Sequence, residues 1–282
     1  MTKNYLSIYA KSFSWAGFFL PKQIYIKCSV LYNFCRSLDD IADQELELNI
    51  KIKQFSEFKG KFVNKNKEHQ IISDMHRLIN DCEISEKIVH DLFDGVASDL
   101  KKEVKINSKK ELLIYSYRVA GTVGLMMAKI LNVKKENSLK AAIDLGIAMQ
   151  LTNIARDVIE DNKKNRKYID SNFESIKKTL VIADTFYKSS FSSISDIPIN
   201  CRFAILVARR IYRQIGYNIL KKKNIKNYNK SGKIYVSNLG KFFQTLLCIF
   251  EFLILLVMKR KGHDRQNEHH IIREEINLNE RI

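Results

Sequence analysis

Apolar residues recur every three or four positions over most of the 282-residue chain, which is the spacing of one face of an α-helix. No stretch alternates apolar and polar residues long enough to predict a sheet, and only two prolines and ten glycines interrupt the pattern. No linker rich in Pro, Gly or Ser divides the chain. We therefore expect one all-α domain. The predicted helices cover residues 24–43, 71–100, 110–132, 137–163, 172–193, 200–223 and 235–260.

The most apolar stretch runs from Phe242 to Met258 and contains Glu251. It falls short of the roughly 20 apolar residues that a membrane-spanning helix needs. Two interpretations remain open. The stretch is either a buried core helix or a helix that lies on a membrane face, where the basic residues 259–261 would suit acidic lipid.

The domain is expected to span residues 1–258 and to be followed by a charged C-terminal tail, residues 259–282. We expect this tail to be loose or to form a short exposed helix. Its three histidines are then expected to lie in water at the surface and not to bind metal. They are His263, His269 and His270.

The amino-acid composition gives information on the binding partners of the protein and on its cellular compartment. The net charge of +17 favours an anionic partner such as nucleic acid, an acidic membrane or a phosphorylated substrate, although a bias towards Lys, Asn and Ile codons explains it equally well. The five cysteines form no CxxC pair, which indicates free thiols in a reducing compartment. The first 23 residues lack the pattern of a secretory signal. We therefore expect a cytoplasmic protein.

Carboxylates are the most informative chemical feature. Of fifteen aspartates, only Asp39/Asp43 and Asp157/Asp161 are paired four residues apart. Both pairs fall in predicted helices, where this spacing places two side chains on one face, roughly 5–6 Å apart at Cβ. One such pair is usually a solvated helix face. Two pairs among Arg and amide residues indicate a site.

Each pair belongs to a polar stripe with helical spacing, and the second stripe is bordered by apolar residues, so we expect it to face inward. Two carboxylates about 6 Å apart repel by roughly 3 kcal/mol at an effective dielectric near 20. Protonation or a divalent metal would relieve this repulsion, and oxygen ligands favour Mg²⁺ that shares its shell with substrate phosphates. The stripes are Tyr32, Arg36, Asp39 and Asp43, and Gln150, Asn153, Asp157 and Asp161.

At these residues the chain resembles the squalene/phytoene synthase family. The matching stretches are KSFSW at 11–15, YNFCRSLDDIAD at 32–43, YSYRVAGTVG at 115–124, LGIAMQLTNIARDVIED at 145–161 and RKY at 166–168. Their order and spacing hold over residues 11 to about 240. The chain departs from the family pattern at Asn165, where Gly is usual, and at Asp170, where Pro is common, so the geometry of that loop is open.

The resemblance implies an isoprenoid synthase helical bundle around a central apolar cavity, with Mg²⁺ (Mn²⁺ being the alternative) at its mouth. It also implies residue roles. Metal would be held by Asp39, Asp43, Asp157 and Asp161. Prenyl diphosphate would be bound by Lys11, Ser12, Ser14, Arg36, Gln150, Asn153, Arg166, Val119, Val123 and Gly124, the last three along the prenyl chain unless they are core residues. Catalytic roles would fall to Tyr32, Tyr115, Tyr168, Arg36 and Arg156.

The resemblance further implies a head-to-head prenyltransferase. The sequence is most like bacterial phytoene synthases, which join two geranylgeranyl diphosphates through a cyclopropylcarbinyl diphosphate in carotenoid biosynthesis and need no NADPH. A squalene, dehydrosqualene or hydroxysqualene synthase using farnesyl diphosphate is the alternative. A non-catalytic membrane assembly factor and a nucleic-acid binder are the other classes; both leave the two Asp pairs unexplained. We expect peripheral membrane association and no nucleic-acid partner, and the sequence predicts no particular oligomeric state.

Overall fold

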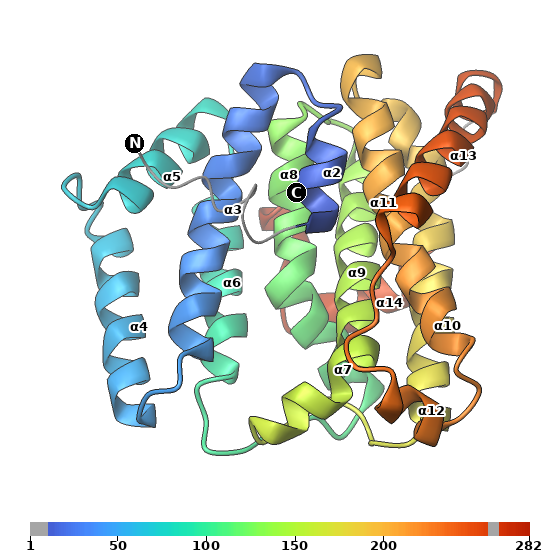
Figure 1. The fold of residues 1–282 in the computed structure, drawn as a ribbon. Helices are drawn as coiled ribbons and strands as arrows, with labels where there is room; N and C mark the ends of the chain where they lie inside the picture. Colours follow the sequence, from blue (N-terminus) through green and yellow to red (C-terminus); the bar gives the residue numbers. More distant parts are fainter. Residues whose placement is uncertain (1–10, 259–264) are drawn as a thin grey trace.

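The computed structural model describes residues 11–258 and 265–282, apart from the side chains of residues 11–13 and 266. Figure 1 shows long helices standing side by side, which confirms the all-α prediction. They are α2 (Lys11–Gly17), α3 (Lys22–Asp43), α4 (Leu48–Val63), α5 (Gln70–Asp81), α6 (Glu86–Ser98), α7 (Lys109–Ser116), α8 (Thr122–Ile130), α9 (Glu136–Lys163), α10 (Phe173–Phe191), α11 (Ile199–Leu220), α12 (Ile225–Lys230), α13 (Asn238–Val257) and α14 (Gln266–Arg273).

Helix α9 is the centre of the bundle, because it packs against α7, α8, α10 and α11. It is buried on several sides, and apolar residues such as Ile147, Leu151 and Ala155 are fully enclosed. A helix surrounded in this way is held in place by packing along its whole length. Any polar side chain near its C-terminal end is therefore fixed against the rest of the bundle.

The predicted helix over residues 71–100 is wrong in one respect: it is two helices, α5 and α6. Glu83 has a φ of +51°, a left-handed conformation that ends α5, and Ser85 precedes α6. The prediction also missed α4, which lies between the predicted helices 24–43 and 71–100. Its signal was the spacing of Phe55, Phe58 and Phe62, which are all buried.

A five-residue π-helix, η1 (Tyr117–Gly121), interrupts the predicted helix 110–132 between α7 and α8. Single π-turns inside helices are rare and are found often at functional sites. Two-residue parallel strands, β1 (Val104–Lys105) and β2 (Arg166–Lys167), pair with each other. They are the only strands among the described residues, and they fix the turn that carries Arg166.

Helices α8 and α9 cross at glycines. A Cβ built on Gly124 would lie 2.2 Å from the carbonyl oxygen of Ala142, and one on Gly146 would lie 2.2 Å from that of Ala120. These oxygens belong to backbone, which cannot move aside cheaply. The structure therefore favours core packing, the alternative left open for Gly124, over a place along a prenyl chain.

We expect Gly146→Ala to lower the free energy of unfolding by about 2–3 kcal/mol, because its methyl group overlaps backbone at the crossing. Gly60→Ala on α4 is the matched control, since a Cβ there meets nothing within 4 Å, and it should raise stability by about 0.5–1 kcal/mol. Urea unfolding of both variants measures the difference. Equal stabilities would contradict the close crossing.

The charged tail is not loose in its described part, which corrects that expectation. Helix α14 packs against α7, and Ile272 and Leu278 are fully buried. His269 is 3% exposed, and its Nε2 lies 2.8 Å from Oδ1 of Asp144. The expectation of a solvated His269 is therefore wrong; His270 is exposed as expected, and His263 lies outside the described residues.

The interpretation of the apolar stretch as a buried core helix is also wrong. Of α13, only Lys241, Cys248 and Leu255 are buried, although α13 packs against α11 along one side. By length and composition α13 could cross a membrane: the mean hydropathy of its best window is 1.9, with 17% of that window buried. Figure 1 shows it at the edge of the bundle.

Candidate active site

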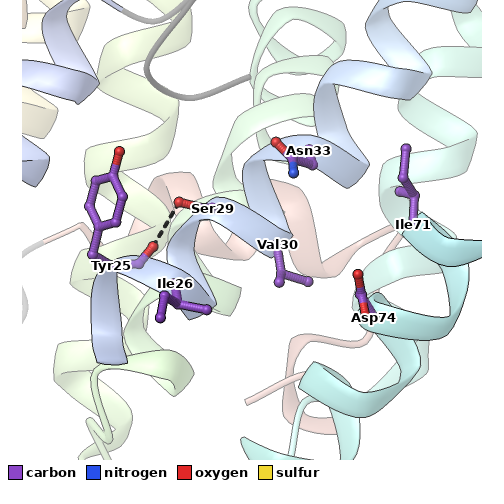
Figure 2. A pocket seen from close by; sticks show the side chains of 7 residues that line it. All are labelled: Tyr25, Ile26, Ser29, Val30, Asn33, Ile71 and Asp74. Atoms are coloured by element: carbon purple, nitrogen blue, oxygen red, sulfur yellow. Dashed lines mark hydrogen bonds between the residues drawn. The ribbon is translucent and has the colours of Figure 1, made fainter. Parts of the chain in front are cut away.

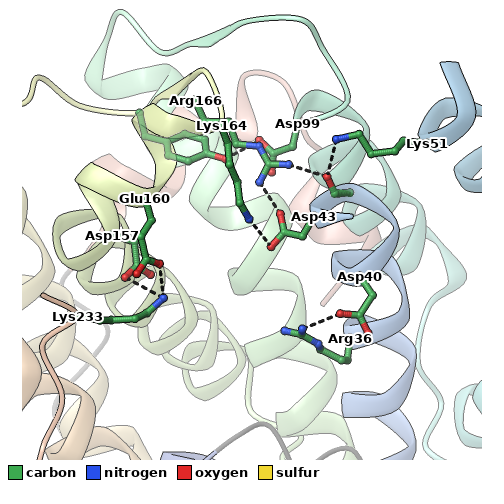
Figure 3. A network of polar contacts seen from close by, with 12 residues as sticks. Arg36, Asp40, Asp43, Lys51, Asp99, Asp157, Glu160, Lys164, Arg166 and Lys233 are labelled. Carbon is green, nitrogen blue, oxygen red and sulfur yellow. Dashed lines mark hydrogen bonds and ion pairs between the residues drawn. The ribbon is translucent and has the colours of Figure 1, made fainter. Parts of the chain in front are cut away.

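Two groups of acidic side chains face each other across the bundle (Figure 3). Asp39 and Asp43 lie in the last turns of α3, and Asp157 and Asp161 lie in the last turns of α9. The chain separates the pairs by more than a hundred residues, yet the fold places both at the same end of the bundle. The structure thus brings together the two Asp pairs that the sequence singled out.

Cations from the turn after α9 reach across to α3. The Nη1 of Arg166 donates to Oδ1 of Asp43 at 2.7 Å, and its Nη2 donates to the carbonyl oxygen of Ala42 at 3.0 Å. The ammonium of Lys164 lies 3.2 Å from Oδ2 of Asp43. Both cations contact the carboxylate of Asp43, so they border the site on this side and neutralise the charge of Asp43. Asp39 does not receive these two contacts.

Asn165, between these two cations, has a φ of +56°. Asparagine tolerates this left-handed region better than most residues, and glycine tolerates it best. The turn is therefore retained, although asparagine stands here where glycine is usual in the family. The geometry of the loop, which the sequence left open, places Arg166 beside the carboxylates.

On the opposite wall, Arg156 binds its neighbour Asp157 through two bonds, Nε to Oδ1 at 2.8 Å and Nη2 to Oδ2 at 2.5 Å. The ammonium of Lys233 lies 3.4 Å from Oδ1 of Asp157 and donates to Glu160. Sequence reasoning missed Lys164, Lys233 and Glu160, which had no paired spacing to distinguish them from other charged residues.

Asp39, Asp43 and Asp161 have shifted pKa values. The protein around Asp39 partly desolvates its carboxyl and, together with the charge of Asp43, raises its pKa; the side chain remains exposed to water. Burial and the neighbouring Asp157 likewise raise the pKa of Asp161 to about 7. Burial also acts on Asp43, but the Arg166 and Lys164 contacts outweigh it and lower its pKa. The site therefore carries negative charge that protein cations only partly neutralise.

The donor set fits a divalent cation. Besides the four carboxylates, the buried Oδ1 of Asn153, one turn before Asp157, has no hydrogen-bond partner among the described residues. Hard oxygen donors of this kind suit Mg²⁺. In the described part of the chain no three acidic, His or Cys side chains are close enough to form a ready-made metal cluster.

A tyrosine pair lies beside the acidic groups. The rings of Tyr115 and Tyr168 stack with centroids 4.7 Å apart, and their hydroxyl oxygens lie 3.0 Å from each other. Both hydroxyls also donate to the carboxylate of Asp99, at 2.8 Å and 2.7 Å. Burial, then the charge of Asp99, raises the pKa of both phenols far above its ordinary value, so both stay protonated.

Asp99 is a site residue that sequence reasoning missed. It directly follows α6 and has no aspartate four residues away, so spacing gave no signal. Burial raises its pKa, while Arg166 and the two phenols oppose this effect. Asp99 thus ties the end of α6 to α7 through Tyr115 and to the turn after α9 through Tyr168.

The remaining predicted site residues have fewer contacts with the acidic groups. Arg36 pairs with Asp40 at 2.6 Å. Tyr32, one turn earlier on α3, is half-buried, and burial raises its pKa. Gln150, Ser14, Val119 and Val123 are half-buried. Lys11 and Ser12 begin α2, and their side chains lie outside the described residues.

Two hollows lie near these elements. One of about 210 Å³ lies between α3 and α5, earlier on α3 than Asp39 (Figure 2), and is lined by Tyr25, Ile26, Ser29, Val30, Asn33, Ile71 and Asp74. A smaller one lies beneath the site and is lined by Ile154, Val158, Asp161, Asn162, Arg166, Tyr168 and Ile169. The large apolar cavity for two prenyl chains stays a prediction.

Comparison with known proteins agrees with this geometry. A family model described as squalene/phytoene synthase matches residues 6–172. The 15-cis-phytoene synthase of Paracoccus sp. (strain N81106 / MBIC 01143) is 37% identical over 149 residues, which cover 46% of this chain and 49% of that protein. The match thus spans about half the length of that relative. The 15-cis-phytoene synthase of Pantoea ananas is 26% identical over 253 residues, covering 76% of this chain and 80% of that protein.

The fold is also similar to a solved one. The crystal structure of a dehydrosqualene synthase in complex with ligand superposes with a TM-score of 0.74 at 24% identity, over 87% of this chain and 93% of that chain. This likeness confirms the predicted isoprenoid synthase fold. At this identity it speaks for the fold alone, and the chemistry rests on the side chains described above.

Proposed function

Because the chain belongs to the squalene/phytoene synthase family, we propose that it is a prenyltransferase that condenses two prenyl diphosphates head to head. The substrate that we favour is geranylgeranyl diphosphate, and the product is phytoene, formed through a cyclopropylcarbinyl diphosphate with loss of two diphosphates and two protons. The observation that carries the proposal is the pair of facing acidic groups on α3 and α9, flanked by Arg and Lys (Figure 3).

Asp39 and Asp43 on one wall, and Asp157 and Asp161 on the other, are the residues that we propose hold Mg²⁺, or Mn²⁺ in its place. When bound, the metal supplies charge neutralisation that makes diphosphate a competent leaving group. The unpartnered Oδ1 of Asn153 supports a place for this side chain in the same site.

The basic residues act on the diphosphate. Arg166, Lys164 and Lys233 already lie against the carboxylates, within 2.7–3.4 Å, so they stand where diphosphate oxygens would meet the acidic walls. Guanidinium groups bind such oxygens through two bonds, which orients the leaving group as well as neutralising it. Arg36 and Arg156 would complete this basic rim.

The tyrosines act on the organic part of the substrate. Loss of diphosphate leaves an allylic cation, which an aromatic face stabilises and which water would destroy. Tyr115 and Tyr168 are 8% and 6% exposed, and Asp99 fixes their rings through hydrogen bonds to the hydroxyls. Tyr32 lies on the α3 side of the same site.

The two candidate activities, phytoene synthase and a synthase that uses farnesyl diphosphate, differ in the chain length of the substrate. Purified protein incubated with Mg²⁺ and either geranylgeranyl or farnesyl diphosphate, with and without NADPH, should yield phytoene from the C20 substrate without NADPH. Squalene or dehydrosqualene from the C15 substrate would favour the alternative. Absence of any hydrocarbon from both substrates would support the non-catalytic assembly factor, against which the intact acidic pairs argue.

Metal affinity should depend on pH. The pKa of Asp161 is raised to about 7, and that of Asp39 is also raised, so below about pH 7 a metal must displace a proton from Asp161. We expect the apparent dissociation constant for Mg²⁺ to fall as the pH rises from about 6 to about 8 and then to level off. Calorimetric titration at several pH values measures this. A flat profile would contradict the raised pKa values.

For location, we propose the cytoplasm with peripheral attachment to a membrane. The reason is chemical: the product is a water-insoluble hydrocarbon, and the substrates are amphiphilic. The five free cysteines support a reducing compartment. Fractionation of cells that express the chain should recover it with membranes at low salt; recovery in the soluble fraction alone would contradict the proposal.

A further inference from the structure

We infer that the outward half of α13 is a docking surface for an anionic lipid bilayer, in which the helix lies along the interface and does not cross it. At 100° per residue, the exposed side chains of α13 cover one continuous half of the helix circumference. Apart from Asn238 at the start of the helix, all of them are apolar. They are Leu239, Phe242, Phe243, Leu246, Leu247, Ile249, Phe250, Leu253, Ile254, Leu256 and Val257, each 41–85% exposed.

The inward half of α13 is the polar one. Gln244 accepts from Nε of Arg210 at 3.0 Å and donates to Gln214 at 3.1 Å, and Glu251 accepts from Nη1 of Arg210 at 2.7 Å. The hydroxyl of Thr245 accepts from the Trp15 indole at 3.0 Å. This arrangement reverses the usual amphipathic helix of a protein in water, and hydrogen bonds to α11 and α2 hold it in place.

A second exposed aromatic side chain is connected to α13. Phe18, at the end of α2, is 85% exposed. A chain of ring contacts leads from it through Phe19 and Phe203 to Phe252 on the inward half of α13, with centroids 5.1–6.2 Å apart. Twenty residues of helix are about 30 Å long, so the surface is far larger than a single exposed side chain.

Charge identifies a bilayer as the occupant. Basic residues lie near the start of α13: Lys221, Lys222 and Lys223 follow α11, whose Asn218 donates to the carbonyl of Tyr235 just before α13. In the sequence, α13 is followed by Lys-Arg-Lys at 259–261. An apolar helix face accompanied by cations matches acyl chains beneath anionic headgroups. Interfaces between proteins typically include several hydrogen bonds, and after Asn238 at its start the outward half of α13 offers no side chain of this kind.

The same contacts explain why the helix lies flat. A crossing helix would have to separate from α11 and carry Glu251 and Gln244 into hydrocarbon without Arg210 and Gln214, which is costly. With the bundle kept intact, only the outward half of α13 can enter the interface. This inference does not depend on the proposed catalytic activity, because it rests on the surface alone.

The test is vesicle binding by the full chain. Wild-type protein should sediment with phosphatidylcholine vesicles containing about one third phosphatidylglycerol, and less with phosphatidylcholine alone or at high salt. The double variant Phe250→Asp/Leu253→Asp should lose at least about tenfold in partition coefficient. The control Val63→Asp/Val181→Asp changes side chains of similar exposure on α4 and α10 and should stay within about twofold of wild type. Circular dichroism confirms that each variant is folded.

Three results would overturn the inference. One is equal vesicle binding by the Phe250/Leu253 variant and wild type. Another is a stable dimer in light scattering that the variant dissociates, with no vesicle binding by wild type, which would assign the surface to a second copy. The third is retention of the bound protein in membranes at high pH, which would show a crossing helix. Release at high pH together with loss of binding in the variant supports the inference.

Discussion

Asn in place of Asp157 or Asp39 is expected to slow turnover at least about a hundredfold, which corresponds to roughly 3 kcal/mol of barrier. Each substitution keeps the shape of the side chain but removes a negative charge from one wall of the site. A metal would then be held by one carboxylate of the pair, and departure of diphosphate would lose much of its charge neutralisation. Steady-state release of diphosphate at saturating Mg²⁺ measures the effect.

Asp81→Asn provides the matched control, because Asp81 is exposed at the end of α5, away from the acidic walls, and should leave turnover within about twofold of wild type. The melting temperature of each variant shows that the fold is retained. Near-normal turnover of both Asp157→Asn and Asp39→Asn would remove the assignment of these residues to a metal.

Asp99→Ala is expected to lower both stability and activity. Its carboxylate accepts hydrogen bonds from two buried tyrosines, and removing it leaves at least one phenol donor unsatisfied, at a cost of about 2–3 kcal/mol in the free energy of unfolding. Loss of the hydrogen bonds to Asp99 makes the turn that carries Tyr168 and Arg166 more mobile. We expect turnover to fall at least about tenfold.

Asp99→Asn separates the two effects. Its amide keeps one acceptor oxygen for a phenol, so stability should recover by about half, whereas the charge beside Arg166 is gone. Urea unfolding together with kcat and KM for both variants distinguishes the outcomes. If Asp99→Ala unfolds like wild type and turns over normally, then the carboxylate does not organise the tyrosine pair.

The acidic walls could be predicted from the sequence because their signal is local. Asp39/Asp43 and Asp157/Asp161 each repeat at one helical step, so spacing alone places each pair on one face. Helix identity was predictable for the same reason. Whether the two pairs face each other, by contrast, depends on how α3 and α9 pack. Only the resemblance to a known family implied that they do.

Other parts of the site depend on contacts between distant residues. Arg166 contacts Asp43, which lies 123 positions away in the sequence, and Asp99 contacts Tyr168, which lies 69 positions away. The periodicity of apolar residues gives no signal for such pairs. The division of residues 71–100 was missed because apolar periodicity continues through Cys82 and Ile84, and the left-handed Glu83 has no compositional signature. Burial of His269 was missed because its partner Asp144 lies on a different helix.

Metal binding in the presence of an unreactive substrate tests the central claim most directly. Mn²⁺ can be titrated by electron paramagnetic resonance against protein that holds a geranylgeranyl diphosphate analogue with sulfur in place of the bridging oxygen. Wild-type protein should bind Mn²⁺ more tightly with the analogue than without it, and Asp39→Asn and Asp157→Asn should each weaken binding at least about tenfold. Unchanged Mn²⁺ affinity in both variants would contradict the account.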